Sequence, residues 1–154
     1  MQKFLKATFA VPTFIFCLYA CASAQTVSGS IGPVERGDSV RGSIVLDIPG
    51  ELHVNSSRPA SRYAIPTTVR LTANGGAKVS GPSYPRGVDR RFQFSEQTIN
   101  VYEGRVKFPF TLRVPANFKG NVVRVRAVVR YQACTNEVCY PPRSKEVALT
   151  ARVK

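Results

Sequence analysis

Two cysteines near the end of this 154-residue chain, Cys134 and Cys139, have the type and spacing that most directly suggest chemistry. Four residues separate them, so a hairpin connection between two strands can bring their sulfurs within disulfide range. The ring that such a bond closes is small, and the chain-entropy model gives it only about 2 kcal/mol of stabilisation. Two interpretations therefore stay open: a disulfide that staples the fold, and a disulfide that is made and broken in function.

The residues beside the pair are compatible with a working disulfide. Pro141-Pro142 is expected to stiffen the exit of the loop. Arg130 and Arg143 flank the loop, and a nearby cation favours a thiolate, although arginines at such positions also serve solubility alone. The spacing is not Cys-x-x-Cys, so the active-site turn of thioredoxin is absent.

The N-terminal residues 1–24 have the features of an export signal. Lys3 and Lys6 give a positive start, residues 7–20 are mainly apolar, and Ala22-Ser23-Ala24 supplies the small residues of a cleavage site. The apolar run contains a proline and is short for a membrane span, which needs about 20 residues. We therefore expect a cleaved signal peptide.

Cleavage would leave a single domain at residues 25–154, beginning at Gln25, in an oxidising compartment where a nearby cysteine pair forms a disulfide. Two alternatives are a retained membrane anchor and lipidation. Leu18-Tyr19-Ala20-Cys21 is similar to a lipoprotein cleavage box, in which Cys21 would be acylated, although a tyrosine is bulky for that box. The chain would then be held at a membrane.

The domain at residues 25–154 is strongly basic. It carries 20 Lys and Arg against nine Asp and Glu, a net charge of +11. Basic domains often bind nucleic acid, but export argues against such a partner and the arginines are scattered. We expect a solvated basic face, or attraction to an acidic protein or an anionic membrane surface.

The pattern of apolar residues predicts strands throughout this domain. Residues 122–131 are the clearest case, because valine, alanine and tyrosine alternate with arginine in the period of two that a strand with one buried side requires. The last strand repeats the alternation, with Val147, Leu149, Ala151 and Val153 expected to face inward. Further strands are predicted at residues 39–48, 52–54, 65–71, 98–102 and 106–114.

Seven to nine short strands predict an all-β fold, an immunoglobulin-like antiparallel β-sandwich. The 11 glycines and 11 prolines are spread along the chain and argue against a helical bundle, since both residues break helices. We expect about the first ten residues of the domain to be loosely ordered.

Tyr131-Gln132-Ala133-Cys134, followed after four residues by Cys139-Tyr140-Pro141-Pro142, resembles the cysteine loop of the N-terminal periplasmic domain of thiol:disulfide interchange protein DsbD. The resemblance runs from about Gly29 to Lys154. Shorter matching segments are Leu52-His53-Val54-Asn55-Ser56, Pro59, Ile65-Pro66-Thr67, Tyr84-Pro85, Phe92-Gln93-Phe94 and Val101-Tyr102-Glu103-Gly104.

The resemblance implies a sandwich whose cysteine pair passes electrons, without a cofactor, from a thioredoxin-like donor to exported partner proteins. The chain would then be a thiol:disulfide oxidoreductase of the protein-disulfide reductase type. By position, Cys139 would form mixed disulfides with partners and Cys134 would resolve them. The family's cap segment would lie within residues 91–96, with Phe92 or Phe94 as the shielding ring; as an alternative, both rings belong to the core.

The sequence departs from the family pattern in two ways. The family typically has five residues between the cysteines, and this chain has four. The family's proteins continue into a membrane domain and a thioredoxin-like domain, whereas this sequence ends at Lys154. We therefore expect either a separate membrane electron conduit and thioredoxin-like protein, or another role on the same scaffold. Asp89 and Glu96 are the candidates for the acidic residues of the cap.

Other kinds of site have little support. His53 is the only histidine, so neither a Cys/His metal site nor a Ser-His-Asp triad is expected, and we predict that it is an ordinary strand residue. The carboxylates are too few and dispersed for a glycosidase pair. The leading hypothesis is a periplasmic thiol–disulfide exchange domain. The alternative is a non-enzymatic secreted β-sandwich that binds a protein or envelope component and uses the disulfide as a staple.

Overall fold

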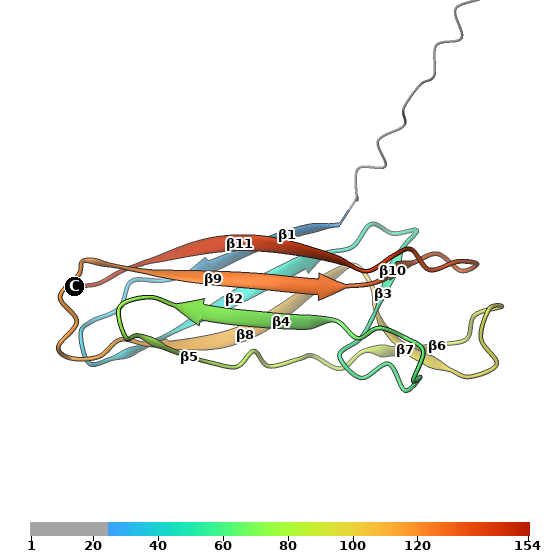
Figure 1. Cartoon of the computed structure of the whole chain (residues 1–154), viewed down its shortest axis with the longest axis horizontal. Coiled ribbons are helices and arrows are strands. Elements are labelled where there is room, and N and C mark those ends of the chain that lie inside the picture. The colour runs from blue at the N-terminus through green and yellow to red at the C-terminus, as the bar shows by residue number, and fades with distance from the viewer. Residues whose placement is uncertain (1–24) are drawn as a thin grey trace, which may run out of the picture.

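A computed structural model describes residues 25–154 and contains eleven strands and no helix in that range, hence no helix that could cross a membrane (Figure 1). The expected signal peptide, with Cys21, lies outside the described residues. All pairs of named strands are antiparallel. The strands are β1 (Thr26–Ile31), β2 (Ser39–Asp47), β3 (His53–Asn55), β4 (Thr68–Ala73), β5 (Lys78–Ser80), β6 (Val88–Arg90), β7 (Ile99–Tyr102), β8 (Arg105–Arg113), β9 (Val122–Tyr131), β10 (Ala133–Cys134) and β11 (Arg143–Arg152).

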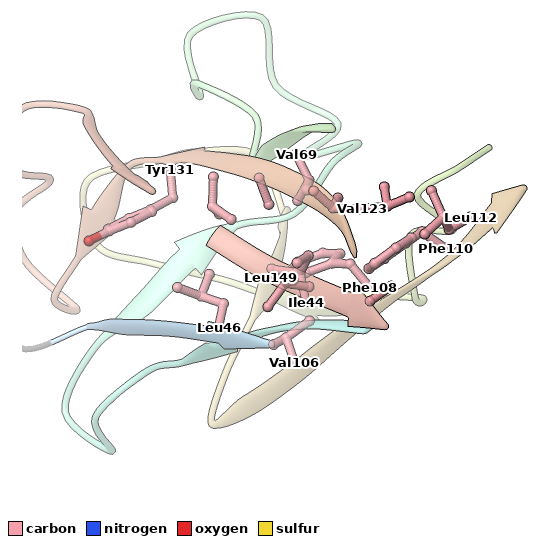
Figure 2. Close-up of a cluster of buried hydrophobic side chains, with 14 of the residues drawn as sticks. Ile44, Leu46, Val69, Val106, Phe108, Phe110, Leu112, Val123, Tyr131 and Leu149 are labelled. Atoms are coloured by element: carbon pink, nitrogen blue, oxygen red, sulfur yellow. The ribbon is translucent and has the colours of Figure 1, made fainter. Parts of the chain in front are cut away.

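Two larger sheets form the body of the sandwich. One has the order β1-β2-β8-β5 and the other the order β11-β9-β4. Alternate side chains of both sheets point into a shared apolar core, in which Ile44, Phe108 and Val123 are completely buried (Figure 2). The predicted immunoglobulin-like sandwich is confirmed.

The long strands follow the sequence pattern closely. β9 spans the ten residues predicted for it, and its apolar side is buried while its arginines are exposed. β2, β7 and β8 begin and end within one residue of their predicted limits, whereas β4 lies about three residues later than expected. Alternating burial therefore predicts the strands of the core well.

The prediction of a loosely ordered start is wrong. β1 pairs with β2 along its whole length, and Gln25 before it is only 2% exposed. The alternation is hidden because Gly29 occupies an inward position of this strand. A Cβ atom there would lie 2.8 Å from the Ser43 carbonyl oxygen and 3.2 Å from Cδ1 of Leu149, so only glycine allows so close an approach.

A third, smaller sheet has the order β10-β3-β7-β6 and lies at the end of the elongated molecule opposite the C-terminus (Figure 1). One of its faces contributes Val54, Tyr102 and Ala133 to the main core. The opposite face carries the residues of alternate register, among them Cys134. The sequence pattern did not predict the short strands β5, β6 and β10. Two of them, β6 and β10, belong to this sheet.

Candidate redox site

The cysteine loop connects β9 to β11 but does not remain in their sheet. After β9, the short strand β10 pairs with β3 of the small sheet. Cys134 and Cys139 then face each other across an isolated antiparallel bridge, with 4.0 Å between their Cα atoms, and a disulfide joins them. The expected hairpin connection thus exists, and its pairing with β3 places the sulfurs in a second sheet.

Thr135 shapes the four-residue turn between the cysteines. Its N–H donates to the Val138 carbonyl at 2.8 Å, and its hydroxyl oxygen accepts from the N–H groups of Glu137 at 3.2 Å and Val138 at 3.1 Å. Below the turn, the Tyr140 N–H donates to the Ala133 carbonyl at 2.8 Å. These local bonds hold both cysteine backbones in place independently of the disulfide.

Gln132 ties the loop to the neighbouring strand. Its side-chain nitrogen donates to the Tyr140 carbonyl at 3.2 Å. Its side-chain oxygen accepts from Nδ2 of Asn55 at 3.0 Å and from the N–H of Ile65 at 3.3 Å. Sequence reasoning assigned no role to this glutamine, because its partners come from segments about 70 residues away.

The two cysteines differ sharply in exposure. Cys134 is completely buried, whereas Cys139 is exposed. The neighbours of Cys139 are exposed apolar residues, Val138 at 53% and Tyr140 at 46%. Cys139 is therefore the member of the pair that lies at the surface, and its two neighbours in the chain are apolar.

A stack of three aromatic rings lies on the face of the small sheet that carries Cys134. His53 of β3 is the cross-strand partner of Cys134, so the two side chains share this face. The His53 ring stacks on Phe92 with 4.2 Å between ring centroids, and Phe92 stacks on Phe94 at 5.2 Å. Phe92 is 9% exposed and packs with Ile99, whereas Phe94 is 40% exposed at the outer end of the stack.

Residues 91–96, the segment predicted to be the cap, contact His53 through Phe92. Of the acidic candidates in the cap, Asp89 accepts a hydrogen bond from Asn100 at 2.7 Å and Glu96 is exposed. The flanking Arg130 and Arg143 are also exposed. Within the described part of the chain, no group of three His, Cys, Asp or Glu side chains is placed to hold a metal ion.

His53 and Glu103 both have shifted pKa values. Burial lowers the pKa of His53 below its usual 6.5, and the nearby Glu103 carboxylate opposes this in part. Hydrogen bonds from Arg90, at 2.8 and 2.9 Å, lower the pKa of Glu103. His53 is therefore neutral near pH 7, and Glu103 is ionised beside it.

The pKa of His53 predicts a pH dependence of stability. The unfolded chain binds a proton at this histidine near pH 6.5 but the folded protein resists it, so the free energy of unfolding should fall as the pH drops below 6.5. In urea unfolding at pH 7.0 and 5.5, we expect this loss to be larger for the wild type than for His53→Phe. The comparison is clean because His53 is the only histidine of the chain. Equal losses in the two proteins would contradict the prediction.

Comparisons with known proteins identify the family of the chain. The model of the family described as "Thiol:disulfide interchange protein DsbD, N-terminal" matches residues 30–151. No curated protein matches the sequence. Among solved structures, the N-terminal periplasmic domain of ScsB from Proteus mirabilis matches with a TM-score of 0.54 and 12% identity, covering 83% of this chain and 46% of that one. This chain therefore spans less than half of that structure.

Two structures from Neisseria meningitidis are also similar. The reduced N-terminal domain of DsbD has a TM-score of 0.49 at 17% identity and covers 82% of this chain and 85% of that one. A complex of the DsbD and PilB N-terminal domains matches with a TM-score of 0.44 at 17% identity, covering 79% of this chain and 80% of that one. The match of the family model over most of the sequence shows that the chain belongs to the family of N-terminal domains of the thiol:disulfide interchange protein DsbD.

Proposed function

We propose that this domain exchanges thiols and disulfides with partner proteins through Cys139, with Cys134 as the resolving cysteine. The observation that carries the proposal is the asymmetry of the pair, in which Cys134 is buried and Cys139 is exposed. The family supports exchange as the general activity. A pair that served only as a staple would need no accessible sulfur.

The exchange proceeds in two balanced steps. A partner thiolate attacks the Cys139 sulfur, which forms a partner–Cys139 disulfide and releases Cys134 as a thiolate. The partner's second thiolate then attacks the partner sulfur and releases the Cys139 thiolate, so the partner is oxidised and the pair is reduced by two electrons. Transfer to an oxidised partner is the reverse: the Cys139 thiolate attacks, and Cys134 then displaces the reduced partner.

The surface around Cys139 suits docking of a protein. Val138 and Tyr140 place exposed apolar area on either side of the reactive sulfur, and apolar area of this kind marks interaction sites. The donor we propose is a thioredoxin-like protein, which would receive electrons through a membrane conduit. Cys134 and Cys139 are the only cysteines in residues 25–154, so any second redox pair lies outside this domain.

The proposed location is the periplasm, reached through a signal peptide at residues 1–24, with lipidation of Cys21 as the alternative to simple cleavage. An oxidising compartment would reoxidise an unprotected dithiol. We propose that the segment at residues 91–96 limits this reaction by holding Phe92 over the face that carries Cys134, with Phe94 as its outer layer.

The reduction potential of the pair tests whether the disulfide works or staples. We expect a value between about −120 and −270 mV, the range of proteins that exchange disulfides, because one sulfur is accessible and the ring is short. Equilibration of the folded domain with glutathione or dithiothreitol buffers, followed by alkylation of free thiols, gives this value. A potential below about −300 mV would instead favour the binding protein with a structural disulfide.

A further inference from the structure

We propose that His53 accepts the proton of the buried Cys134 thiol when the reduced pair is oxidised, an inference that rests on the exchange function proposed above. In that direction the Cys134 thiol must lose its proton before it can displace the partner from Cys139, because the thiolate is the nucleophile. A buried thiol ionises reluctantly without a nearby base. The Cys134 side chain is completely buried, so the base that takes its proton must lie inside the protein.

The position of His53 is suited to this role. It is the cross-strand partner of Cys134, and side chains in this relation point to the same face with Cβ atoms about 5 Å apart. Stacking on Phe92 fixes the plane of the ring, and the residue is only 4% exposed. The ring is therefore held on the face that carries Cys134, by the sheet on one side and by Phe92 on the other.

One nitrogen of His53 has an unexplained environment. Nε2 is buried and has no hydrogen-bond partner among the described residues. Buried polar atoms nearly always have a partner, and an exception calls for a reason. The sulfur of Cys134 carries no proton in the disulfide, but the reduced pair would supply an S–H group or a thiolate. Nε2 of His53 therefore lacks a partner in the oxidised protein and would gain one at Cys134 when the pair is reduced.

The charges around His53 keep it neutral but able to take a proton. Burial favours the neutral ring, while the carboxylate of Glu103, which Arg90 holds by an ion pair, favours the protonated ring. Glu51, in the turn before β3, lines the same hollow as His53. On the cap and the cysteine loop, the charged side chains of Arg91, Glu96 and Glu137 are exposed. The Glu103 carboxylate stabilises the imidazolium that forms briefly during proton transfer.

A small hollow connects His53 with the surface of the cysteine loop. Its volume is about 230 Å³, and it is lined by His53, Glu51, Glu103 and Asn136, with Gly50, Leu52 and Gly104. Asn136 belongs to the turn between the two cysteines. A proton taken up by His53 therefore has a polar route to the place where the partner thiolate leaves.

The step balances in atoms and charge. His53 takes the proton from Cys134, and the resulting thiolate attacks the Cys139 sulfur of the mixed disulfide. The Cys134–Cys139 bond forms, the partner sulfur departs as a thiolate, and the proton passes from His53 to that thiolate through water in the hollow. The pair is oxidised by two electrons and the partner is reduced by two.

A coloured aromatic disulfide measures this step directly. One equivalent of dithiobis(nitrobenzoate) added to the reduced domain releases one thionitrobenzoate when Cys139 attacks and a second when Cys134 displaces the adduct. In stopped-flow absorbance at pH 7, we expect His53→Phe, which keeps a ring against Phe92, to slow the second release at least about tenfold. The first release should change less than about twofold.

The pH profile separates proton transfer from a structural effect. The wild-type rate of the second release should level off above the pKa of His53, whereas the His53→Phe rate should keep rising with pH until the two converge in alkali. His53→Gln, which stays polar but is not basic, should behave like His53→Phe. Glu35→Gln is the control, because it removes an exposed carboxylate beside the Val34–Val153 bridge and outside this site.

Three other results would be informative in different ways. Wild-type second-phase kinetics in both His53 variants would overturn the inference, and so would slowing by one constant factor at every pH. If the wild type itself gives no rapid first release from Cys139, the exchange function fails rather than the role of His53.

Discussion

Replacing Cys139 by serine is expected to slow the reaction of the reduced domain with an external disulfide by at least about 1,000-fold, as removal of other enzymatic nucleophiles does. The remaining thiol, Cys134, is completely buried, so neither a partner nor a small reagent can approach it. In Cys134→Ser the exposed Cys139 remains, and this variant should react quickly and then hold its adduct, because no resolving thiol is left. Release of thionitrobenzoate from dithiobis(nitrobenzoate) measures both rates.

The two variants control for each other. Both variants lose the same disulfide, and therefore the same modest stabilisation from a small ring. A difference between their reaction rates therefore reflects the position of the remaining thiol and not a difference in folding. In denaturant, where both thiols are exposed, the two rates should become equal. Equal rates in the folded variants, or faster reaction at Cys134, would reverse the proposed roles of the two cysteines. With a thioredoxin as the probe, only Cys134→Ser should accumulate a mixed disulfide on a non-reducing gel.

The core of the fold and the reactive pair could be predicted from the sequence because both are local in sequence. Alternating apolar and charged residues along β9 require only that one side of a strand be buried, and two cysteines at short spacing require only a turn. The physical information in each case lies within about ten consecutive residues. The burial difference between the two sulfurs lies outside such a window, since it arises when β10 pairs with β3.

The surroundings of the pair could not be predicted because they are assembled from distant segments. His53 was expected to be an ordinary strand residue, and that expectation missed its two neighbours: Cys134, 81 residues later, and Phe92, 39 residues later. Glu103 follows directly after β7 and lines the same hollow as His53. A lone histidine has no periodicity or motif that reveals such contacts, and only the sheet order brings these residues together.

β1 shows a different limit of sequence reasoning. Its sequence is rich in serine and glycine, a composition that predicts a loop. Gly29 is present because Leu149 and the neighbouring strand lie too close for any side chain, so the residue that obscures the strand is required by its packing. A close approach between two strands is a tertiary property, and the sequence shows it only as a missing apolar residue.

Removal of the Phe92 ring is expected to have the largest effect of any change in the cap. Phe92 is 9% exposed and packs with Ile99 and Val101, so Phe92→Ala should lower the free energy of unfolding by about 3 kcal/mol, at the low end for a buried phenylalanine. It should also speed reduction of the folded disulfide by dithiothreitol at least about tenfold, because opening of this face needs less free energy once the stack on His53 is lost. Urea unfolding and alkylation of thiols at timed intervals measure the two effects.

Phe94→Ala is the matched control, since the same ring is removed from the exposed end of the same stack. We expect it to cost less than about 1 kcal/mol and to change the reduction rate by less than about threefold. Phe92→Leu restores apolar volume without the ring, so it should recover much of the stability but less of the protection. If neither alanine variant changes the rate, Phe92 is only a core residue of the small sheet. If Phe94→Ala speeds reduction more than Phe92→Ala does, the shielding ring is Phe94. The ring that covers the sulfurs must be the one whose removal exposes them to the reductant.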